Sequence, residues 1–240
     1  MTFRSFIQPP TCAEIIPGLW VGDLSSVSTD EIATSSSKSL PSPSSDSGRK
    51  KVVTVITILF EQYYIDLAKD YFELQHRQRK DALDEGDASN ERLHRCRMNT
   101  TYIKHVVFTL EDKFDADLLS MLPSALEAID EALGVDVNKA SSPITPSDNE
   151  SLGTETTIKP IGDDDDSPER ICLVHCFKGM SRSVSVIIAY LLSRHSHRFK
   201  SFEEALHHVR NERPIACPNV GFALALRQFQ KTITTTTTTD

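Results

Sequence analysis

A single stretch, Ile171–Leu192, limits the possible folds of this chain more than any other part of the sequence. It opens with a short apolar run, Ile171–Val174, which is typical of a buried strand. After a turn-forming segment the chain is apolar again over Val184–Leu192, long enough with the turn before it for a buried helix. The pattern therefore predicts a strand, a short loop and a helix, with Cys176 where the strand ends and Arg182 where the helix begins.

This arrangement is suited to binding an anion. The first turn of a helix carries unpaired backbone N–H groups and a partial positive charge, and Gly179 allows the preceding loop to curl so that its amides point inward. The guanidinium of Arg182 can bind two oxygens of one phosphate. Cysteines at helix N-termini ionise readily, with pKa values of ~3.5–7.5. Cys176 is therefore a candidate nucleophile toward phosphorus. The alternative is a buried structural cysteine beside a surface arginine, which the neighbouring His, Gly and Arg disfavour.

Residues 175–183, HCFKGMSRS, have the order His-Cys, five residues, Arg and Ser. This order resembles the signature of the cysteine-dependent protein phosphatases, in the form used by the dual-specificity phosphatases. The resemblance extends to IPGLWVG at 16–22, SFEEALHHVRNERP at 201–214 and PNVGFALALRQF at 218–229. It implies hydrolysis of phosphotyrosine, and of phosphoserine and phosphothreonine, through a cysteinyl-phosphate intermediate.

The resemblance also implies roles for individual residues. Cys176 is the nucleophile, Ser183 steadies the thiolate as it leaves, and His175 orients the loop and lowers the pKa of the thiol. Arg182 and the loop amides hold the phosphoryl oxygens, so no metal or cofactor is implied. Asn219 matches a position that braces the loop, although a helix cap explains it equally well. The phosphate-binding loop is expected to comprise Phe177, Lys178, Gly179, Met180, Ser181 and Arg182.

A proton donor for the leaving oxygen must come from another part of the chain. In the family it is an Asp on a loop after a strand and before a helix, and Asp112 lies in that context, five residues before the pair Asp117-Leu118. Asp115 is the competing candidate and Glu111 is the third. A helix N-cap is the alternative role for Asp115 or Asp117.

Several segments have the patterns of strands and helices. Residues 13–22 contain two apolar runs separated by Pro17-Gly18, and residues 52–60 and 102–108 are further strand candidates. Apolar residues recur at helical spacing after residue 61 and again from near Asp117, and Gly134 is a plausible end of the second helix. Ser201 and Glu204 form a capping box at the start of a further helix. The fold class predicted is α/β, a phosphatase-type central, mostly parallel sheet of about five strands flanked by helices.

Composition divides the chain into one domain with two insertions. We expect an N-terminal segment at 1–12, a dual-specificity phosphatase-like domain at 13–232 and a Thr-rich tail at 233–240. Residues 25–50 are rich in Ser, and residues 136–169 combine Pro, Ser and Thr with a run of Asp. Low hydrophobicity predicts that both are disordered insertions.

The overall composition narrows the partners and the compartment. The formal net charge of −8 argues against bulk binding of nucleic acid. There is no apolar run of membrane-spanning length and no signal-peptide pattern near the start. Five widely spaced cysteines fit reduced thiols in the cytoplasm or nucleus. We expect a monomer that acts on phosphorylated proteins, without nucleic-acid or membrane partners.

Three other functions remain open at this level. The first is a module that binds phosphoproteins with weak or no catalysis. Such modules are expected to lack the cysteine, the arginine or the acid, whereas this chain has a candidate for each. A phosphatase of non-protein esters, such as phosphoinositides or RNA, is the second. Such relatives often carry more positive charge in the loop, where Lys178 is the only lysine. The rhodanese-like group is the third, and the C-terminal helices and Asp112 argue against it.

Overall fold

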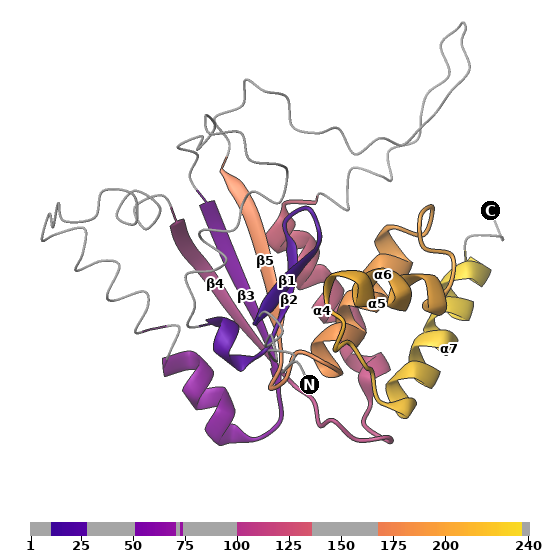
Figure 1. Cartoon of the computed structure of the whole chain (residues 1–240), viewed down its shortest axis with the longest axis horizontal. Coiled ribbons are helices and arrows are strands. Elements are labelled where there is room, and N and C mark those ends of the chain that lie inside the picture. The colour runs from indigo at the N-terminus through magenta and orange to yellow at the C-terminus, as the bar shows by residue number, and fades with distance from the viewer. Residues whose placement is uncertain (1–10, 28–50, 71–72, 74–99, 136–167, 237–240) are drawn as a thin grey trace, which may run out of the picture.

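A five-stranded sheet in the order β1-β2-β5-β3-β4 runs through the computed structural model, which describes residues 11–27, 51–70, 73, 100–135 and 168–236. Figure 1 shows the strands side by side, with the helices gathered mainly on one side. The strands are β1 (Cys12–Ile16), β2 (Leu19–Gly22), β3 (Lys51–Leu59), β4 (Thr100–Thr109) and β5 (Glu169–His175).

The sheet is parallel except at one edge. Strand β1 pairs antiparallel with β2, and the pairs β2–β5, β5–β3 and β3–β4 are all parallel. The turn between β1 and β2 contains Gly18 at a φ of 80°, a left-handed conformation that glycine adopts without strain. The predicted α/β class with a mostly parallel sheet is therefore confirmed. Since the parallel strands end at the same edge, their carboxyl ends gather the loops that follow them.

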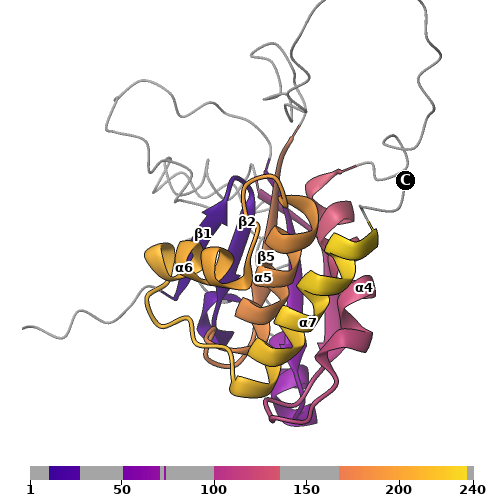
Figure 2. The same cartoon turned by 90° about the vertical axis from the view of Figure 1, so that its right-hand side faces the viewer.

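Four helices form the second layer. These are α4 (Leu118–Leu133), α5 (Arg182–Arg194), α6 (Phe202–Glu212) and α7 (Val220–Thr236). Figure 2, which views the helical side, shows α5 and α7 running next to each other in front of the sheet. The main core lies between the layers and joins Ile56 and Val174 of the sheet to Ile187 of α5. Almost every residue of α5 is buried, as the apolar run Val184–Leu192 predicts.

The opposite face of the sheet has its own apolar clusters. Trp20, Val55 and Leu173 pack together in one of them. A helix over residues 62–70 packs Ile65 and Ala68 against Leu59 at the carboxyl end of β3. This helix agrees with the helical spacing seen after residue 61.

Local signals at the helix ends behave largely as expected. Gly134 ends α4 in the left-handed conformation, and Asp117 caps its start by accepting from the Ser120 N–H. Ser201 caps α6 by accepting from the Glu204 N–H, but the Glu204 carboxylate accepts from the N–H of Lys200, so the capping box is not reciprocal in the usual way.

The predicted boundaries need three corrections. Helix α7 continues to Thr236, beyond the expected domain end at residue 232, and the Thr234 hydroxyl donates to the carbonyl four residues earlier. The expected insertion 25–50 begins with a short 3-10 helix, η1 (Leu24–Val27), and Glu169 belongs to β5 rather than to the insertion 136–169. The parts of the two insertions at 28–50 and 136–167, and the segment 1–10, lie outside the described residues. In the described ranges, no helix combines the length and apolar character needed to cross a bilayer.

Candidate active site

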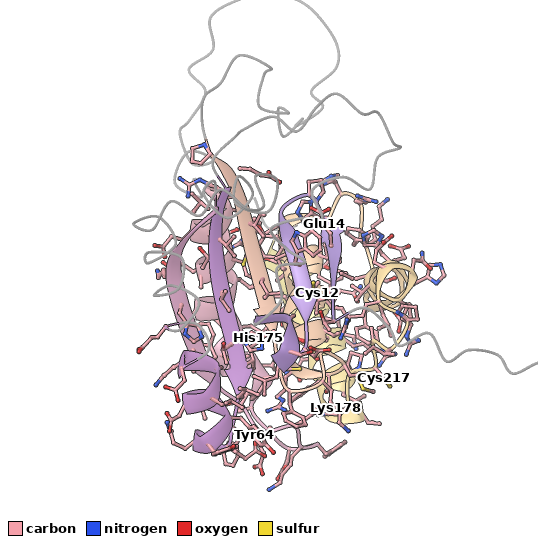
Figure 3. The ribbon with its side chains drawn as sticks, turned by 60° about the vertical axis from the view of Figure 1, so that its left-hand side comes forward. Cys12, Glu14, Tyr64, His175, Lys178 and Cys217 are labelled. Carbon is pink, nitrogen blue, oxygen red and sulfur yellow. The ribbon has the colours of Figure 1, made fainter. Side chains whose placement is uncertain are left out.

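Cys176 and Arg182 lie at the carboxyl end of the parallel strands. Strand β5 ends at His175, and α5 begins at Arg182, so the intervening loop joins the centre of the sheet to a buried helix. Figure 3 shows His175 and Lys178 towards this end of the molecule, with Glu14 near the other. The strand, loop and helix predicted around Cys176 are thus present.

The backbone carbonyl oxygens of residues 177–180 all accept hydrogen bonds from groups on the outer side of the loop. The Phe177 carbonyl accepts from the Leu24 N–H at 3.2 Å, and the Met180 carbonyl accepts from the Cys217 N–H at 2.8 Å. Between them, the carbonyls of residues 178 and 179 accept from the side chain of Arg213. In a planar trans peptide the C=O and the following N–H point in opposite directions. The N–H groups of residues 178–181 are therefore directed to the inner side of the loop, where they form a concave anion site.

The sulfur of Cys176 lies at this inner side. It accepts from the backbone N–H of Gly179 and from the hydroxyl of Ser183, both at 3.2 Å. Both donors favour a negative charge on the sulfur. Gly179 has a φ of 62°, and a Cβ there would come within 2.6 Å of the Gly22 carbonyl oxygen, so the loop requires glycine at this position.

The guanidinium of Arg182 is buried beside the loop. Its Nη1 donates to the Leu110 carbonyl at 3.2 Å, and its Nε lies 3.9 Å from Oδ2 of Asp112. That distance is too long for a hydrogen bond, and Nε has no hydrogen-bond acceptor among the described residues. A buried cationic donor of this kind is suited to an incoming phosphoryl oxygen.

Asp112 is the candidate acid that the structure brings to the loop. Its Oδ1 accepts from the Ser181 hydroxyl at 2.7 Å and from the Asn219 side-chain amide at 2.8 Å. Asn219 also caps α7 by accepting from the Phe222 N–H, and its backbone N–H donates to the Ser181 hydroxyl of the loop at 3.1 Å. Glu111 instead pairs with Lys113.

The other two acidic candidates lie elsewhere on this segment. Asp117 is the N-cap of α4, and its bonds to Ser120 lower the pKa of its carboxyl. Asp115 is exposed on the segment between β4 and α4. The geometry therefore favours Asp112 over the alternatives.

Comparison with known families agrees with this geometry. The model described as "Dual specificity phosphatase, catalytic domain" matches residues 148–232, which contain the Cys176 loop, α5, α6 and most of α7. Over this stretch the chain is similar to the dual-specificity phosphatase family.

Two similar curated proteins each match about a quarter of this chain. Dual specificity protein phosphatase 1 of Arabidopsis thaliana is 44% identical over 61 residues, which are 25% of this chain and 29% of that protein. Dual specificity protein phosphatase 22 of Homo sapiens is 48% identical over 60 residues, 25% of this chain and 31% of that protein. The matched stretch therefore spans about a third of the length of these relatives. The crystal structure of a human DUSP28 variant is similar in fold, with a TM-score of 0.50 at 19% identity, covering 95% of this chain and 99% of that one.

His175, which directly precedes Cys176, is fully buried. Its Nε2 lies 2.6 Å from the hydroxyl of Thr57, which lies 2.8 Å from Nε2 of His105. Burial, together with the neighbouring His105, lowers the pKa of His175 to about 3, so the ring is neutral at physiological pH. A neutral ring has no charge with which to stabilise a thiolate. Of the two expected roles of His175, orienting the loop is therefore the one that the geometry supports.

Arg213 is the main site residue that the sequence analysis missed. It is fully buried behind the loop, where its Nε donates to the Gly179 carbonyl at 2.7 Å and its Nη2 to the Lys178 carbonyl at 3.3 Å. Nη2 also lies 3.6 Å from Oδ2 of Asp23. Burial lowers the pKa of Arg213, and Asp23 opposes this. Buried arginines are rare, but no local sequence signal distinguishes this one from Arg210 three residues earlier.

A hollow of about 430 Å³ lies beside the Asp112 segment. Its lining comes from the ends of β3 and β4 and the first turns of α4, and comprises Phe60, Thr109, Leu110, Glu111, Ala116, Asp117, Ser120 and Met121. It adjoins the cysteine site through Leu110 but does not include Cys176 or Arg182. Among the residues that the structure describes, no three His, Cys, Asp or Glu side chains gather as the ligands of a metal ion would.

Proposed function

We propose that this chain hydrolyses phosphate monoesters on proteins, including phosphotyrosine and phosphoserine or phosphothreonine, through a cysteinyl-phosphate intermediate. The observation that carries the proposal is the loop geometry. The carbonyls of residues 177–180 all bind outward, so the amides converge on the side where Cys176 and Arg182 lie.

In the first step the Cys176 sulfur attacks phosphorus, forming an S–P bond as the bond from phosphorus to the ester oxygen breaks. The loop amides and Arg182 hold the three phosphoryl oxygens, whose negative charge is spread over them as the phosphoryl group moves. Asp112 donates a proton to the departing oxygen, which leaves as the hydroxyl of Tyr, Ser or Thr on the substrate protein.

In the second step water attacks the phosphorus and the S–P bond breaks. Asp112 accepts the proton from the water, inorganic phosphate leaves, and the Ser183 hydroxyl stabilises the returning thiolate at 3.2 Å. Because Oδ1 of Asp112 is already bonded to Ser181 and Asn219, Oδ2 is the oxygen that carries the transferred proton.

A phosphoprotein substrate is favoured by the surface around the loop. Phe177 is partly exposed and packs against Tyr64 of the 62–70 helix, with ring centroids 4.7 Å apart. Asp112 is also 38% exposed, so a phosphorylated side chain presented on another protein can reach it. Lys178 is the only lysine in the loop, which disfavours highly charged phosphoinositides.

The first test compares two cysteine variants with the wild type on an aryl phosphate and on phosphopeptides containing Tyr, Ser or Thr. Cys176→Ser should lose at least about 10⁴-fold in kcat, because the nucleophile is removed. Cys217→Ser, which alters an exposed thiol next to the loop, should retain turnover. Mass spectrometry of acid-quenched wild type should show a phosphoryl group on Cys176. Turnover that survives Cys176→Ser would refute the mechanism, and phosphopeptide binding without any turnover would indicate a binding module instead.

The role of Asp112 needs a test that separates proton donation from support of the fold. Asp112→Asn should slow a phosphotyrosine peptide by about 10²-fold but slow an aryl phosphate with a good leaving group much less, because the latter needs no proton. Asp115→Asn, a change of the same kind three residues away, should leave both rates unchanged. Equal losses on the two substrates would contradict acid catalysis by Asp112.

A further inference from the structure

Three polar side chains form a connected group behind the Cys176 loop, on the face of the sheet opposite α4 and α5. His175 ends β5, and Thr57 is its direct neighbour in the parallel register with β3. His105 comes from β4, on the far side of β3. The Thr57 hydroxyl lies 2.6 Å from Nε2 of His175 and 2.8 Å from Nε2 of His105, so one oxygen joins the two imidazoles.

The shared hydroxyl has only one hydrogen to donate. Thr57 is completely buried, and within the described residues its hydroxyl hydrogen-bonds to these two imidazoles. Were both imidazoles to donate an N–H to the oxygen, the hydroxyl hydrogen would have no acceptor, which is unfavourable in a buried site. One imidazole therefore accepts from Thr57, and the other donates to it.

The groups around His175 indicate which imidazole accepts the hydrogen of Thr57 and which donates to its oxygen. Among the described residues Nδ1 of His175 is buried without a hydrogen-bond partner, and we assign the ring hydrogen to this atom because the backbone of Cys176 favours a hydrogen on the ring. With that hydrogen on Nδ1, the neutral ring has a free lone pair on Nε2 and accepts the hydrogen of Thr57. His105 then donates its Nε2–H to the Thr57 oxygen. The hydrogen bonds run in one direction, from β4 through β3 to the first residue of the active-site loop.

Building on the function proposed above, we propose that Thr57 and His105 are positioning residues for the Cys176 loop. Through the shared hydroxyl they hold the ring of His175 in the Nδ1–H tautomer and in one orientation. Since Cys176 directly follows His175, the orientation of the ring determines where the sulfur lies relative to the Gly179 amide and the Ser183 hydroxyl.

The surroundings of this group are apolar on most sides. Val55 and Leu173 belong to the adjoining apolar cluster, and Leu59 to the next one. Lys69 of the 62–70 helix disfavours a proton on the His105 imidazole. His105 is only half-buried, so it connects the buried Thr57 and His175 to the side of the molecule carrying that helix.

The experiment compares Thr57→Val, which removes the hydroxyl at nearly constant volume, with Thr57→Ser, which keeps it. Thr54→Val is the matched control, because Thr54 is a buried threonine on the same strand whose side chain faces the other layer. His105→Leu removes the second imidazole, and His105→Gln retains a planar side chain with an N–H donor. Thermal denaturation first establishes that each variant folds. If Thr57→Val does not fold, the His105 variants still test the proposal.

Two of the readouts do not depend on turnover. Long-range nitrogen–proton NMR spectra of labelled protein should show one Nδ1–H tautomer for His175 in the wild type, Thr57→Ser and Thr54→Val, and a mixture in Thr57→Val and His105→Leu. The pH midpoint for alkylation of Cys176 by iodoacetamide should move to higher pH in the same two variants. With an aryl phosphate, these two should lose roughly tenfold to a hundredfold in kcat with little change in KM, as when an active-site imidazole loses its orienting partner.

The following outcomes would overturn the proposal. An unchanged tautomer and alkylation midpoint in Thr57→Val would show that the hydroxyl does not position His175, and equal effects of Thr54→Val would show only general damage to the strand. If His105→Leu kept the wild-type tautomer of His175 and the wild-type pH midpoint for Cys176 alkylation, His105 would not be a positioning residue. If the wild type turned over no phosphate ester while Thr57→Val still altered the tautomer, the proposed function would fail and the positioning would stand.

Discussion

The Cys176 loop has an arginine side and a histidine side, and the buried groups on the two sides differ in charge. Arg182 and Arg213 flank the loop from α5 and from the end of α6, and both guanidinium groups are buried. His175 and His105 lie on the opposite face of the sheet, where burial lowers the pKa of His175 to about 3 and that of His105 to about 4. A guanidinium keeps its charge in such surroundings, whereas an imidazole loses it.

The comparison separates two contributions to the loop, the positive charge of the arginines and the orienting effect of His175. Buried positive charge at the loop comes from the two arginines. Nε of Arg182 has no hydrogen-bond partner among the described residues, and Arg213 binds the loop carbonyls. The neutral imidazole of His175 contributes a fixed ring and a hydrogen-bond partner at the first residue of the loop. Four measurements test this division, in order of decreasing expected effect.

The largest effect should follow the loss of Arg182. Arg182→Met should lower kcat/KM for an aryl phosphate by about 10³-fold, because the cation that stabilises the moving phosphoryl oxygens is removed. Arg227→Met, which breaks an exposed ion pair with Glu203, should leave turnover unchanged. Steady-state kinetics measures both. A loss below about tenfold for Arg182→Met would mean that the loop amides supply nearly all of the charge stabilisation.

Arg213→Met should lower kcat/KM by about 10- to 100-fold and also destabilise the fold, because two loop carbonyls and Asp23 lose a buried partner. The free energy of unfolding should fall by about 3–5 kcal/mol, the range for removing one member of a buried charged pair. Arg210→Met removes only a bond to the Ala216 carbonyl and should cost about 1 kcal/mol. Denaturant unfolding and vanadate affinity measure the two effects, and unchanged vanadate binding in Arg213→Met would show that it does not shape the anion site.

The histidine side should appear in the pH dependence of stability. His105 has an ordinary pKa of 6.5 in the unfolded chain and about 4 in the fold. Between these values the unfolded state binds more protons, so stability falls as the pH falls. His105→Gln should make that fall less steep by up to ~1.4 kcal/mol per pH unit, and by less to the extent that solvent screens the half-buried ring. His207→Gln on the exposed face of α6 is the control, and equal slopes in wild type and His105→Gln would contradict the neutral state of His105.

Asp23→Asn should have the smallest effect, about twofold in kcat/KM. Its Oδ2 lies 3.6 Å from Nη2 of Arg213, and the change leaves the bonds of Arg213 to the Gly179 and Lys178 carbonyls in place. The amide oxygen of Asn can still accept from the backbone N–H groups of Ser25 and Ser26, which hold the turn after β2. A loss as large as that of Arg213→Met would show that Asp23 and Arg213 act as one unit, and a double variant would measure their coupling.

Much of the fold could be predicted because its signals are local. The apolar runs at Ile171–Val174 and Val184–Leu192 and the stop at Gly134 each describe a few neighbouring residues, and all three are present in the structure. The extension of α7 through Thr236 was not predicted, because a run of threonines gives a weak helical signal, and here side-chain bonds to preceding carbonyls accompany the helix.

What the sequence alone determined is the pairing of Cys176 with Arg182. Both belong to one strand, loop and helix, so their spacing along the chain already sets their spacing in space. Asp112 was ranked first by its place before a helix, and the tertiary structure put it against Ser181, 69 positions along the chain. Thr57, His105 and Arg213 were decided only by the tertiary structure. Thr57 meets His175 across 118 positions, and Arg213 meets Gly179 across 34. The register of parallel strands and the docking of α6 depend on packing over the whole domain, and no short stretch of sequence encodes them.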